Sequence, residues 1–206
     1  MSQLERAVEV MDRLRSPGGC AWDATQTHET LARYLLEETY EVLEAIETGD
    51  PALLREELGD LLLQVLFHAR LAEELPEPYS IEDVAGDLVD KLVRRHPHVF
   101  ADAERTDAAT LNETWEHSKI SEKGRTSAVD GVPLAQPALA LAAKLVSRAG
   151  RAGLEVETGT DDPIGERLFA VVRDAVASGI DPETALRRTA RSYRAAILAA
   201  EQQPRP

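Results

Sequence analysis

The amino-acid sequence predicts an all-α protein. Extended runs in which β-branched or aromatic residues alternate with polar ones are absent, and aromatic residues make up only 4% of the chain. Apolar residues instead recur every three or four positions, which is the spacing of one helix face. Capping residues, prolines and glycines divide this pattern into segments of helical length. Together these observations indicate a bundle of packed helices.

Four helices are expected in the N-terminal half of the chain. The first stops at the Ser-Pro-Gly-Gly stretch 16–19, and a loop covering 20–28 follows. The fourth opens at Ser80, where Asp83 three residues later gives a start like a capping box, and it ends before a proline. The predicted helices are residues 1–15, 29–48, 51–74 and 80–96.

Four more helices are expected in the C-terminal half: 108–123, a helix ending near 150, and two that close the chain, the last opening at Asp181. The stretch 124–137 contains glycine, serine and two prolines and is the best candidate for a boundary. We therefore expect a helical module over 1–125 and a C-terminal helical segment over 126–206.

Composition restricts the possible functions. The net charge of -14 argues against a sequence-independent nucleic-acid binder, which needs a basic face. A single cysteine, Cys20, excludes an intramolecular disulfide and fits a reducing compartment. The N-terminus reads as a charged amphipathic helix rather than a signal peptide, and no apolar run approaches the ~18 residues of a membrane span. We expect a soluble, cytoplasmic protein that binds neither nucleic acid nor membranes.

The second and third predicted helices are expected to form an antiparallel hairpin. Gly49 suits the left-handed position that ends a helix, Asp50 suits the cap of the next one, and Pro51 suits its first turn. Folding the chain back at this point brings residues at equal distances from the turn to the same height.

Two acidic half-sites flank this turn. They are Glu37-Glu38-x-x-Glu41 and Glu57-x-x-Asp60, and their spacings make the carboxylates neighbours on one helix face. At ~1.5 Å per residue, the first lies ~16 Å from the turn and the second ~13 Å. The acids therefore meet on adjacent helices, which is the arrangement that a divalent-cation site needs.

The apolar pattern places two of these acids toward the helix interface. Glu38 and Glu57 interrupt apolar stripes formed by Leu31, Leu35, Val42 and Ala45 and by Leu54, Leu61 and Val65. A carboxylate in such a position is costly without a cation or hydrogen bonds, and only Arg33 and Arg55 are available locally. Carboxylate ligands favour a hard ion such as Mg²⁺ or Mn²⁺. A solvated acidic face is the alternative.

A basic cluster ends the fourth helix. Lys91, Arg94, Arg95 and His96 suggest anion binding, with phosphate as the natural ligand. Ordinary complementation of the helix dipole explains the cluster equally well. His96 and His98 could bind a metal, but the proline between them favours packing or capping of the turn.

Three other side chains, Trp22, Trp115 and His68, could either contact a ligand or pack in the core. Trp22 lies in a loop rich in Asp, Thr and Gln, which is able to stack on and hydrogen-bond a nucleobase. Trp115 lies on a helix, where core packing is the commoner role. His68 lies on the apolar side of the third helix and is expected to be a core histidine with its hydrogen bonds satisfied.

The tryptophan loop, both acidic half-sites and the basic cluster lie in the stretches 20–23, 26–28, 34–41, 56–65 and 90–100. Through these stretches the chain resembles the MazG family of nucleoside triphosphate (NTP) pyrophosphohydrolases. Weaker similarity continues at 115–119 and 130–133. The stretch Cys20-Ala21-Trp22-Asp23 departs from the family pattern at Ala21, where the family has a proline.

The resemblance implies a Mg²⁺-dependent, homodimeric all-α hydrolase that converts an NTP to a nucleoside monophosphate (NMP) and pyrophosphate, with a possible house-cleaning role against altered nucleotides. It also implies three groups of site residues. Glu37, Glu38 and Glu41 are the catalytic acids, with Glu37 positioning or deprotonating water. The remaining groups are the metal ligands Glu38, Glu41, Glu57 and Asp60, and the substrate contacts Lys91, Arg94 and Arg95 for phosphate and Trp22, Asp23 and Gln26 for base and sugar.

The C-terminal half resembles a reduced second module. The segment 165–172 looks like a worn copy of a Gly-Asp-Leu-Leu-Phe stretch, and the acidic helix before it is reduced to 155–163. We therefore expect the C-terminal helices to be structural and to bind no metal. Two other functional classes are weighed: a catalytically silent helical scaffold, and a di-metal carboxylate bundle, whose Glu-x-x-His motifs this chain lacks.

Overall fold

The computed structural model describes residues 1–101, 126–159 and 161–202, and within them it confirms the all-α fold. These residues contain eight α-helices, one short 3₁₀ helix and no strand. The expected helix over 108–123, with Trp115, lies outside the described residues. The helices are α1 (Gln3–Arg15), α2 (His28–Thr48), α3 (Pro51–Ala72), α4 (Ile81–Arg95), α5 (Pro97–Phe100), α7 (Ala138–Arg151), α8 (Pro163–Ala177) and α9 (Pro182–Glu201), and the 3₁₀ helix is η1 (Asp23–Thr25).

The chain divides into two compact units, Met1–Ala108 and Ala109–Pro206. The expected boundary between 125 and 126 stays a prediction, because the residues on its N-terminal side are outside the described ranges. Short helix α5 was not predicted. Pro97 at its first position suits a helix start, and its four residues follow α4 directly.

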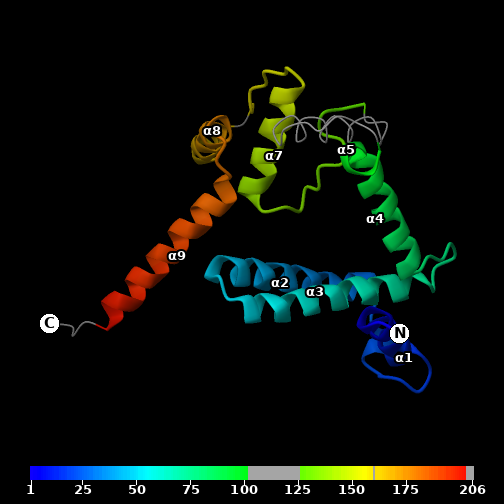
Figure 1. The fold of residues 1–206 in the computed structure, drawn as a ribbon. Coiled ribbons are helices and arrows are strands. Elements are labelled where there is room, and N and C mark those ends of the chain that lie inside the picture. Colours follow the sequence, from blue (N-terminus) through cyan, green and yellow to red (C-terminus); the bar gives the residue numbers. More distant parts are fainter. Residues whose placement is uncertain (102–125, 160, 203–206) are drawn as a thin grey trace. The chain divides into compact units, whose positions relative to one another are not determined.

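The predicted hairpin is confirmed, with α2 and α3 side by side (Figure 1). Gly49 ends α2 in the left-handed region at φ 72°. The Asp50 side chain caps α3 by accepting hydrogen bonds from the N–H groups of Ala52 (2.9 Å) and Leu53 (3.2 Å). Pro51 occupies the first turn of α3, where its missing N–H costs nothing. Local sequence alone therefore fixes the fold-back that aligns the two helices.

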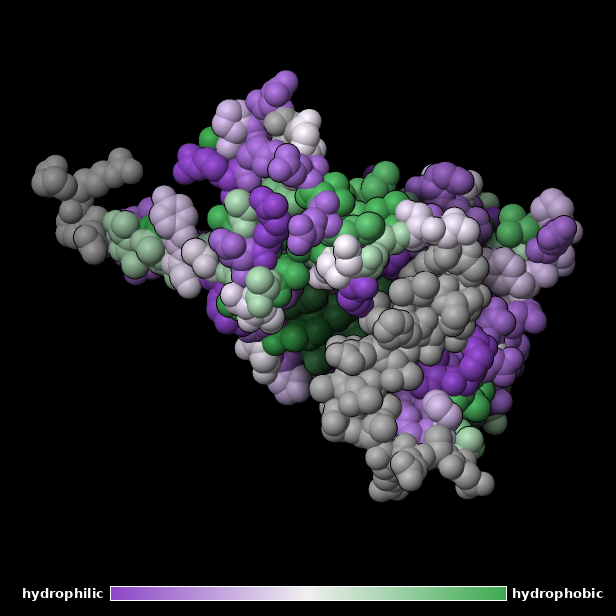
Figure 2. Space-filling view, turned by 90° about the horizontal axis from the view of Figure 1, so that it is seen from above, coloured by the Kyte–Doolittle hydropathy of each residue, from purple (hydrophilic) through white to green (hydrophobic). Residues whose placement is uncertain are grey.

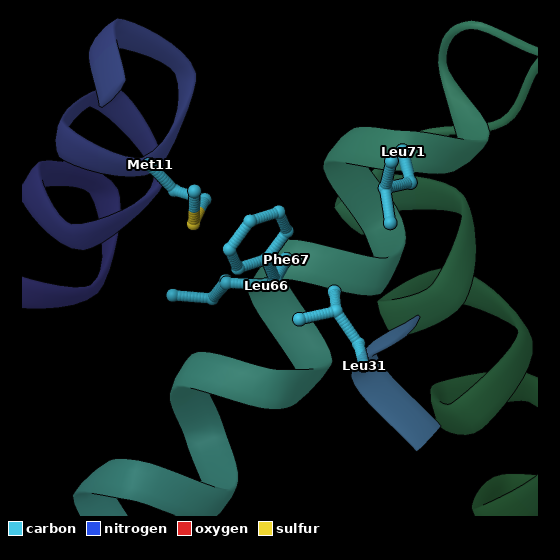
Figure 3. Close-up of a cluster of buried hydrophobic side chains, with 5 residues drawn as sticks. All are labelled: Met11, Leu31, Leu66, Phe67 and Leu71. Carbon is cyan, nitrogen blue, oxygen red and sulfur yellow. The ribbon is translucent and has the colours of Figure 1, made fainter. Parts of the chain in front are cut away.

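The core of the first unit lies beyond the middle of the hairpin, toward the end opposite this turn. Figure 3 shows Met11 of α1 and Leu31 of α2 pointing toward Leu66 and Phe67 of α3. Leu71 completes the buried cluster, and Ile81 at the start of α4 packs against it. Burial of these side chains, worth ~1.5–3 kcal/mol each, holds α1 and the start of α4 on the hairpin.

Arginine side chains tie α1 and the following loop to α3. The Arg15 guanidinium donates two hydrogen bonds to the carboxylate of Glu74 (2.8 and 2.9 Å) and others to the backbone carbonyls of Asp23 and Gln26. Arg70 of α3 pairs with Asp12 of α1 at 2.7 Å. The loop is thus held by a largely buried cation rather than by packing alone.

The second unit is a smaller helical assembly in which α7, α8 and α9 contact one another. Val172 of α8 is its best-buried large side chain among the described residues. Arg148 of α7 donates to the carbonyls of Ala128 (3.2 Å) and Asp130 (2.7 Å), which holds the segment before α7 against that helix.

Large apolar side chains remain at the surface in each unit, among polar ones (Figure 2). Val89 in α4 and Leu186 in α9 are each 55% exposed. None of the helices in the described ranges is long and apolar enough to span a membrane.

Candidate functional site

The hairpin brings three of the predicted metal ligands together. Glu38 and Glu41 of α2 and Glu57 of α3 each offer a carboxylate oxygen, and these three oxygens lie within 4.8 Å of one another. Glu38 and Glu57 are half-buried, whereas Glu41 is exposed. The cluster is the product of the turn, because Glu41 and Glu57 are at nearly equal numbers of residues from it.

The fourth predicted ligand and the fifth acid also lie in this neighbourhood. Asp60 is half-buried one turn after Glu57, and its charge acts on both Glu38 and Glu57. Glu37 is exposed, and its charge acts on Glu38. The five acids expected from the sequence thus share one electrostatic environment.

Partial burial and mutual repulsion make this environment unfavourable for ionised carboxylates. Burial raises the pKa of Glu38, and a hydrogen bond with Glu41 and the charges of Asp60, Glu41 and Glu37 raise it further. The pKa of Glu57 is raised first by partial burial and then by the charges of Glu41, Glu56 and Asp60. Arg33, one of the two local cations, turns to Tyr34 instead, donating to its hydroxyl and lying over its ring at 4.5 Å.

The donor set fits a hard divalent cation. All the ligand atoms are carboxylate oxygens, which Mg²⁺, Mn²⁺ and Ca²⁺ prefer, and a cation would neutralise the repulsion that raises both pKa values. In the part of the chain that the structure describes, this is the one group of three or more such ligands.

The loop residues predicted to contact base and sugar surround η1. Trp22 is half exposed and makes edge-to-face contacts with the rings of Tyr34 and Phe67, whose centroids lie 6.0 and 6.3 Å from that of its own ring. Asp23 and Gln26 are buried. The Gln26 amide is engaged by the loop and by the first turn of α2, since its nitrogen donates to the Trp22 carbonyl (3.0 Å) and its oxygen accepts from the Thr30 hydroxyl (2.8 Å).

The basic cluster lies in the last turns of α4. Lys91 and Arg94 are exposed and Arg95 is half-buried. Helix α4 contacts α3 and leaves the hairpin at the end opposite Gly49 (Figure 1). Within the single chain, the structure does not bring this cluster beside the acids. His96 uses Nδ1 to contact the Leu92 carbonyl (2.6 Å), which agrees with the expected role in the turn.

One expectation for the hairpin is wrong. His68 is half-buried, but its hydrogen bonds are not all satisfied within residues 1–101, 126–159 and 161–202: Nδ1 lies 2.7 Å from Nδ1 of His28, while Nε2 is buried and has no partner in these ranges. The two imidazole rings are nearly parallel, with centroids 5.0 Å apart and an interplanar angle of 4°. Sequence reasoning missed this pair because the two histidines meet only once the hairpin has formed.

The comparisons with known proteins identify the family. A MazG nucleotide pyrophosphohydrolase domain matches residues 26–100. The Thermotoga maritima nucleoside triphosphate pyrophosphohydrolase/pyrophosphatase MazG is 38% identical over 213 residues, covering 92% of this chain and 82% of that protein. The chain belongs to the MazG family.

Two further relatives are similar to this chain over at least 90% of its length. A 26.1 kDa protein of Streptomyces cacaoi is 54% identical over 97% of this chain and 83% of its own length. The nucleoside triphosphate pyrophosphohydrolase of Mycobacterium tuberculosis is 46% identical over 90% of this chain, but this chain spans only 54% of that protein. The MazG match includes α2, α3 and α4, and therefore both acidic half-sites and the basic cluster, whereas Trp22 and Asp23 precede it.

Proposed function

We propose that this MazG protein hydrolyses nucleoside triphosphates to a nucleoside monophosphate and pyrophosphate at the acid cluster of the α2–α3 hairpin. The observation that carries the proposal is the convergence of the carboxylates of Glu38, Glu41 and Glu57 to within 4.8 Å inside the segment that matches the family. Relatives with this segment are named for the same reaction.

The acids would hold Mg²⁺, with Mn²⁺ as a substitute, through Glu38, Glu41, Glu57 and Asp60. A bound divalent cation neutralises phosphate charge and lowers the pKa of a coordinated water. Metal binding needs ionised carboxylates, so the cation also has to overcome the raised pKa values of Glu38 and Glu57.

The remaining residues would act on water and phosphate. Glu37, which is exposed one position before Glu38, would orient the attacking water and accept its proton. The water oxygen forms a bond to phosphorus, the bridging P–O bond breaks, and pyrophosphate and NMP separate. Attack at the α or the β phosphorus gives the same products. Lys91, Arg94 and Arg95 do not lie beside the acids of their own chain, so they would neutralise charge on the phosphates from a second copy of the chain.

The proposed function includes the assembly of two copies of the chain into a homodimer. Helix α4 leaves five large apolar side chains at least 37% exposed, namely Val84, Leu88, Val89, Leu92 and Val93. A homodimer that covers this face would remove these apolar side chains from water. Light scattering should give twice the mass of one chain, and Leu88→Glu should shift the protein toward the monomer.

The C-terminal helices would be structural in this proposal, with the catalytic module ending near residue 125.

A house-cleaning role is the finer part of the proposal, in which triphosphates with altered bases are the preferred substrates. It predicts a higher kcat/KM for the triphosphates of inosine or 8-oxoguanosine than for ATP, GTP, CTP and UTP.

A substrate panel tests the reaction. Each triphosphate is incubated with the protein and Mg²⁺, then with excess chelator, and NMP and pyrophosphate are quantified. The proposal requires both products in equal amounts and no turnover with chelator. Turnover unaffected by chelator contradicts the role of the acid cluster, and equal kcat/KM for all bases contradicts only the house-cleaning role.

A further inference from the structure

A hollow of about 310 Å³ lies between α2, α3 and the start of α4. This volume is at the lower end of the range for small-molecule sites. Most of its wall is apolar, contributed by Leu35, Val65, Ala69, Tyr79 and Val84. All these residues belong to the first unit, so the hollow is a feature of that unit alone.

Two polar side chains line this hollow with buried atoms that have no hydrogen-bond partner among the described residues. They are Gln64, through Oε1, and His68, through Nε2. Gln64 is only 5% exposed. Buried polar atoms are nearly always hydrogen-bonded, since an unpaired one carries the full cost of leaving water. Two such atoms in the wall of one apolar hollow therefore point to a ligand with a polar edge.

The contact with His28 determines whether Nε2 of His68 donates or accepts a hydrogen bond. One of the two Nδ1 atoms, 2.7 Å apart, must carry the hydrogen that joins the rings. Burial, and then the charge of His28, lowers the pKa of His68, which favours the neutral form of its imidazole. A neutral imidazole has one N–H, so Nε2 of His68 is an acceptor when its Nδ1 donates to His28 and a donor when His28 donates.

The hollow continues the acid cluster along the hairpin. Glu57, Asp60, Gln64 and His68 are separated by three, four and four residues, so they lie on one face of α3. At 1.5 Å per residue, the midpoint of Gln64 and His68 is roughly 11 Å along the axis from that of Glu57 and Asp60. On α2, Leu35 lies one turn before Glu38 and lines the hollow.

We propose that this hollow binds the nucleobase of the triphosphate, with Gln64 and His68 hydrogen-bonding to the polar edge of the base. The proposal rests on the proposed function, because it takes the acid cluster as the site of the phosphates. A flat heterocycle has apolar faces for Leu35, Val65 and Tyr79, and every common base offers an N–H for Gln64 Oε1. The sugar and phosphates separate the base from the metal ligands, as the spacing along α3 requires.

In this proposal the base is recognised by Gln64 and His68 of the hairpin rather than by the loop that contains Trp22 and Gln26. The amide of Gln26 is already used within the loop, and Trp22 packs its ring edge-on with Tyr34 and Phe67. Gln64 and His68, by contrast, each have a buried polar atom that no other described residue uses. The loop then supports the wall of the site, and the hairpin selects the base.

Kinetics on the full chain with Mg²⁺ test the assignment. Gln64→Met keeps the volume of the side chain and removes its amide, while Leu63→Met, at the adjacent exposed position, is the matched control. Substrates are the four common NTPs and ribose 5-triphosphate, which lacks a base. Loss of one hydrogen bond predicts a ~3- to 10-fold rise in KM for NTPs, less than about twofold change in kcat, and no change for ribose 5-triphosphate. Leu63→Met should match the wild type.

A binding measurement keeps the two proposals separable. The imidazole ¹⁵N resonance of His68, assigned with His68→Asn, should shift on adding a non-hydrolysable NTP analogue and stay unchanged with inorganic triphosphate. Absence of pyrophosphate release by the wild type would overturn the proposed function, and the His68 resonance would still decide the base site. An unmoved resonance, or a Gln64→Met variant that treats NTPs and ribose 5-triphosphate alike, overturns the base site while leaving the reaction intact.

Discussion

Glu38 of α2 and Glu57 of α3 present carboxylate oxygens to each other across the hairpin, within the 4.8 Å span of the acid cluster. Both have a raised pKa, because each is partly buried and each faces other acids. Repulsion between the ionised acids therefore disfavours the folded state. In the proposed function a cation would relieve this repulsion and supply the chemistry of the reaction, so we expect stability and activity to respond oppositely to loss of these charges.

Replacing one member of this pair separates the two responses. Glu57→Gln, and separately Glu38→Gln, should lower kcat/KM at least ~100-fold through loss of a metal ligand, and both should raise the melting temperature of the metal-free protein at pH 7. Glu44→Gln, on an exposed part of α2, is the charge-matched control. Pyrophosphate assays and thermal unfolding in chelator give the two values. A Glu57→Gln variant that unfolds at a lower temperature would show that the charge is stabilising.

The pH dependence of stability has a definite sign. The pKa of Glu38 and of Glu57 is higher in the folded protein than the ordinary value of 4.5. The folded state then binds more protons than the unfolded state, so the contribution of these groups to stability falls as pH rises from about 4.5 through their raised pKa values. Glu74 and Asp83, with lowered pKa values, act in the opposite direction.

The difference between wild type and the Glu38→Gln/Glu57→Gln double variant isolates the acid pair. In chelator, the double variant should gain on the wild type as pH rises from 4.5 to 7, measured by thermal unfolding. Saturating Mg²⁺ should reduce this difference, because the cation stabilises only the protein that binds it. A difference that is constant with pH would mean that the two acids titrate normally in the folded protein.

The sequence alone was enough to predict the hairpin and the acid cluster. Gly49, Asp50 and Pro51 act locally, so their roles follow from residue type, and helical periodicity then brings Glu38 and Glu57 to one level. That Nε2 of His68 has no hydrogen-bond partner in the described part of the chain could not be predicted in this way. It depends on contact with His28, which is distant in sequence, and on where Tyr79 and Val84 close the hollow. The path of α4 also depends on tertiary packing at Ile81.

The turn that aligns the acids can be weakened without touching them. Asp50→Ala removes the cap of α3 and should lower the free energy of unfolding by ~1 kcal/mol. In Gly49→Ala the added Cβ has no neighbouring atom within 4 Å. The expected loss in the free energy of unfolding, ~1–2 kcal/mol, therefore comes from the left-handed backbone alone. Urea titrations measure both losses, and Gly49→Asn should recover part of the second. A Gly49→Ala protein as stable as wild type would show that the turn has changed its geometry.

The C-terminal unit offers a test of its structural role. Glu166, in the first turn of α8, accepts a hydrogen bond from Thr158. Glu166→Ala should leave kcat and KM within about twofold of wild type and lower stability by ~0.3–1 kcal/mol, the usual value of an acid at a helix start. Steady-state kinetics and urea unfolding provide the comparison. Loss of turnover in a folded Glu166→Ala protein would assign this unit a part in catalysis.

The most direct test of the central claim follows the first products by ³¹P NMR. A single NTP is mixed with the full chain and Mg²⁺, and spectra are recorded from the earliest turnover. Cleavage at the acid cluster predicts simultaneous growth of NMP and pyrophosphate in equal amounts, and neither signal with Glu57→Gln. Growth of nucleoside diphosphate and orthophosphate, or unchanged product formation by Glu57→Gln, would contradict it.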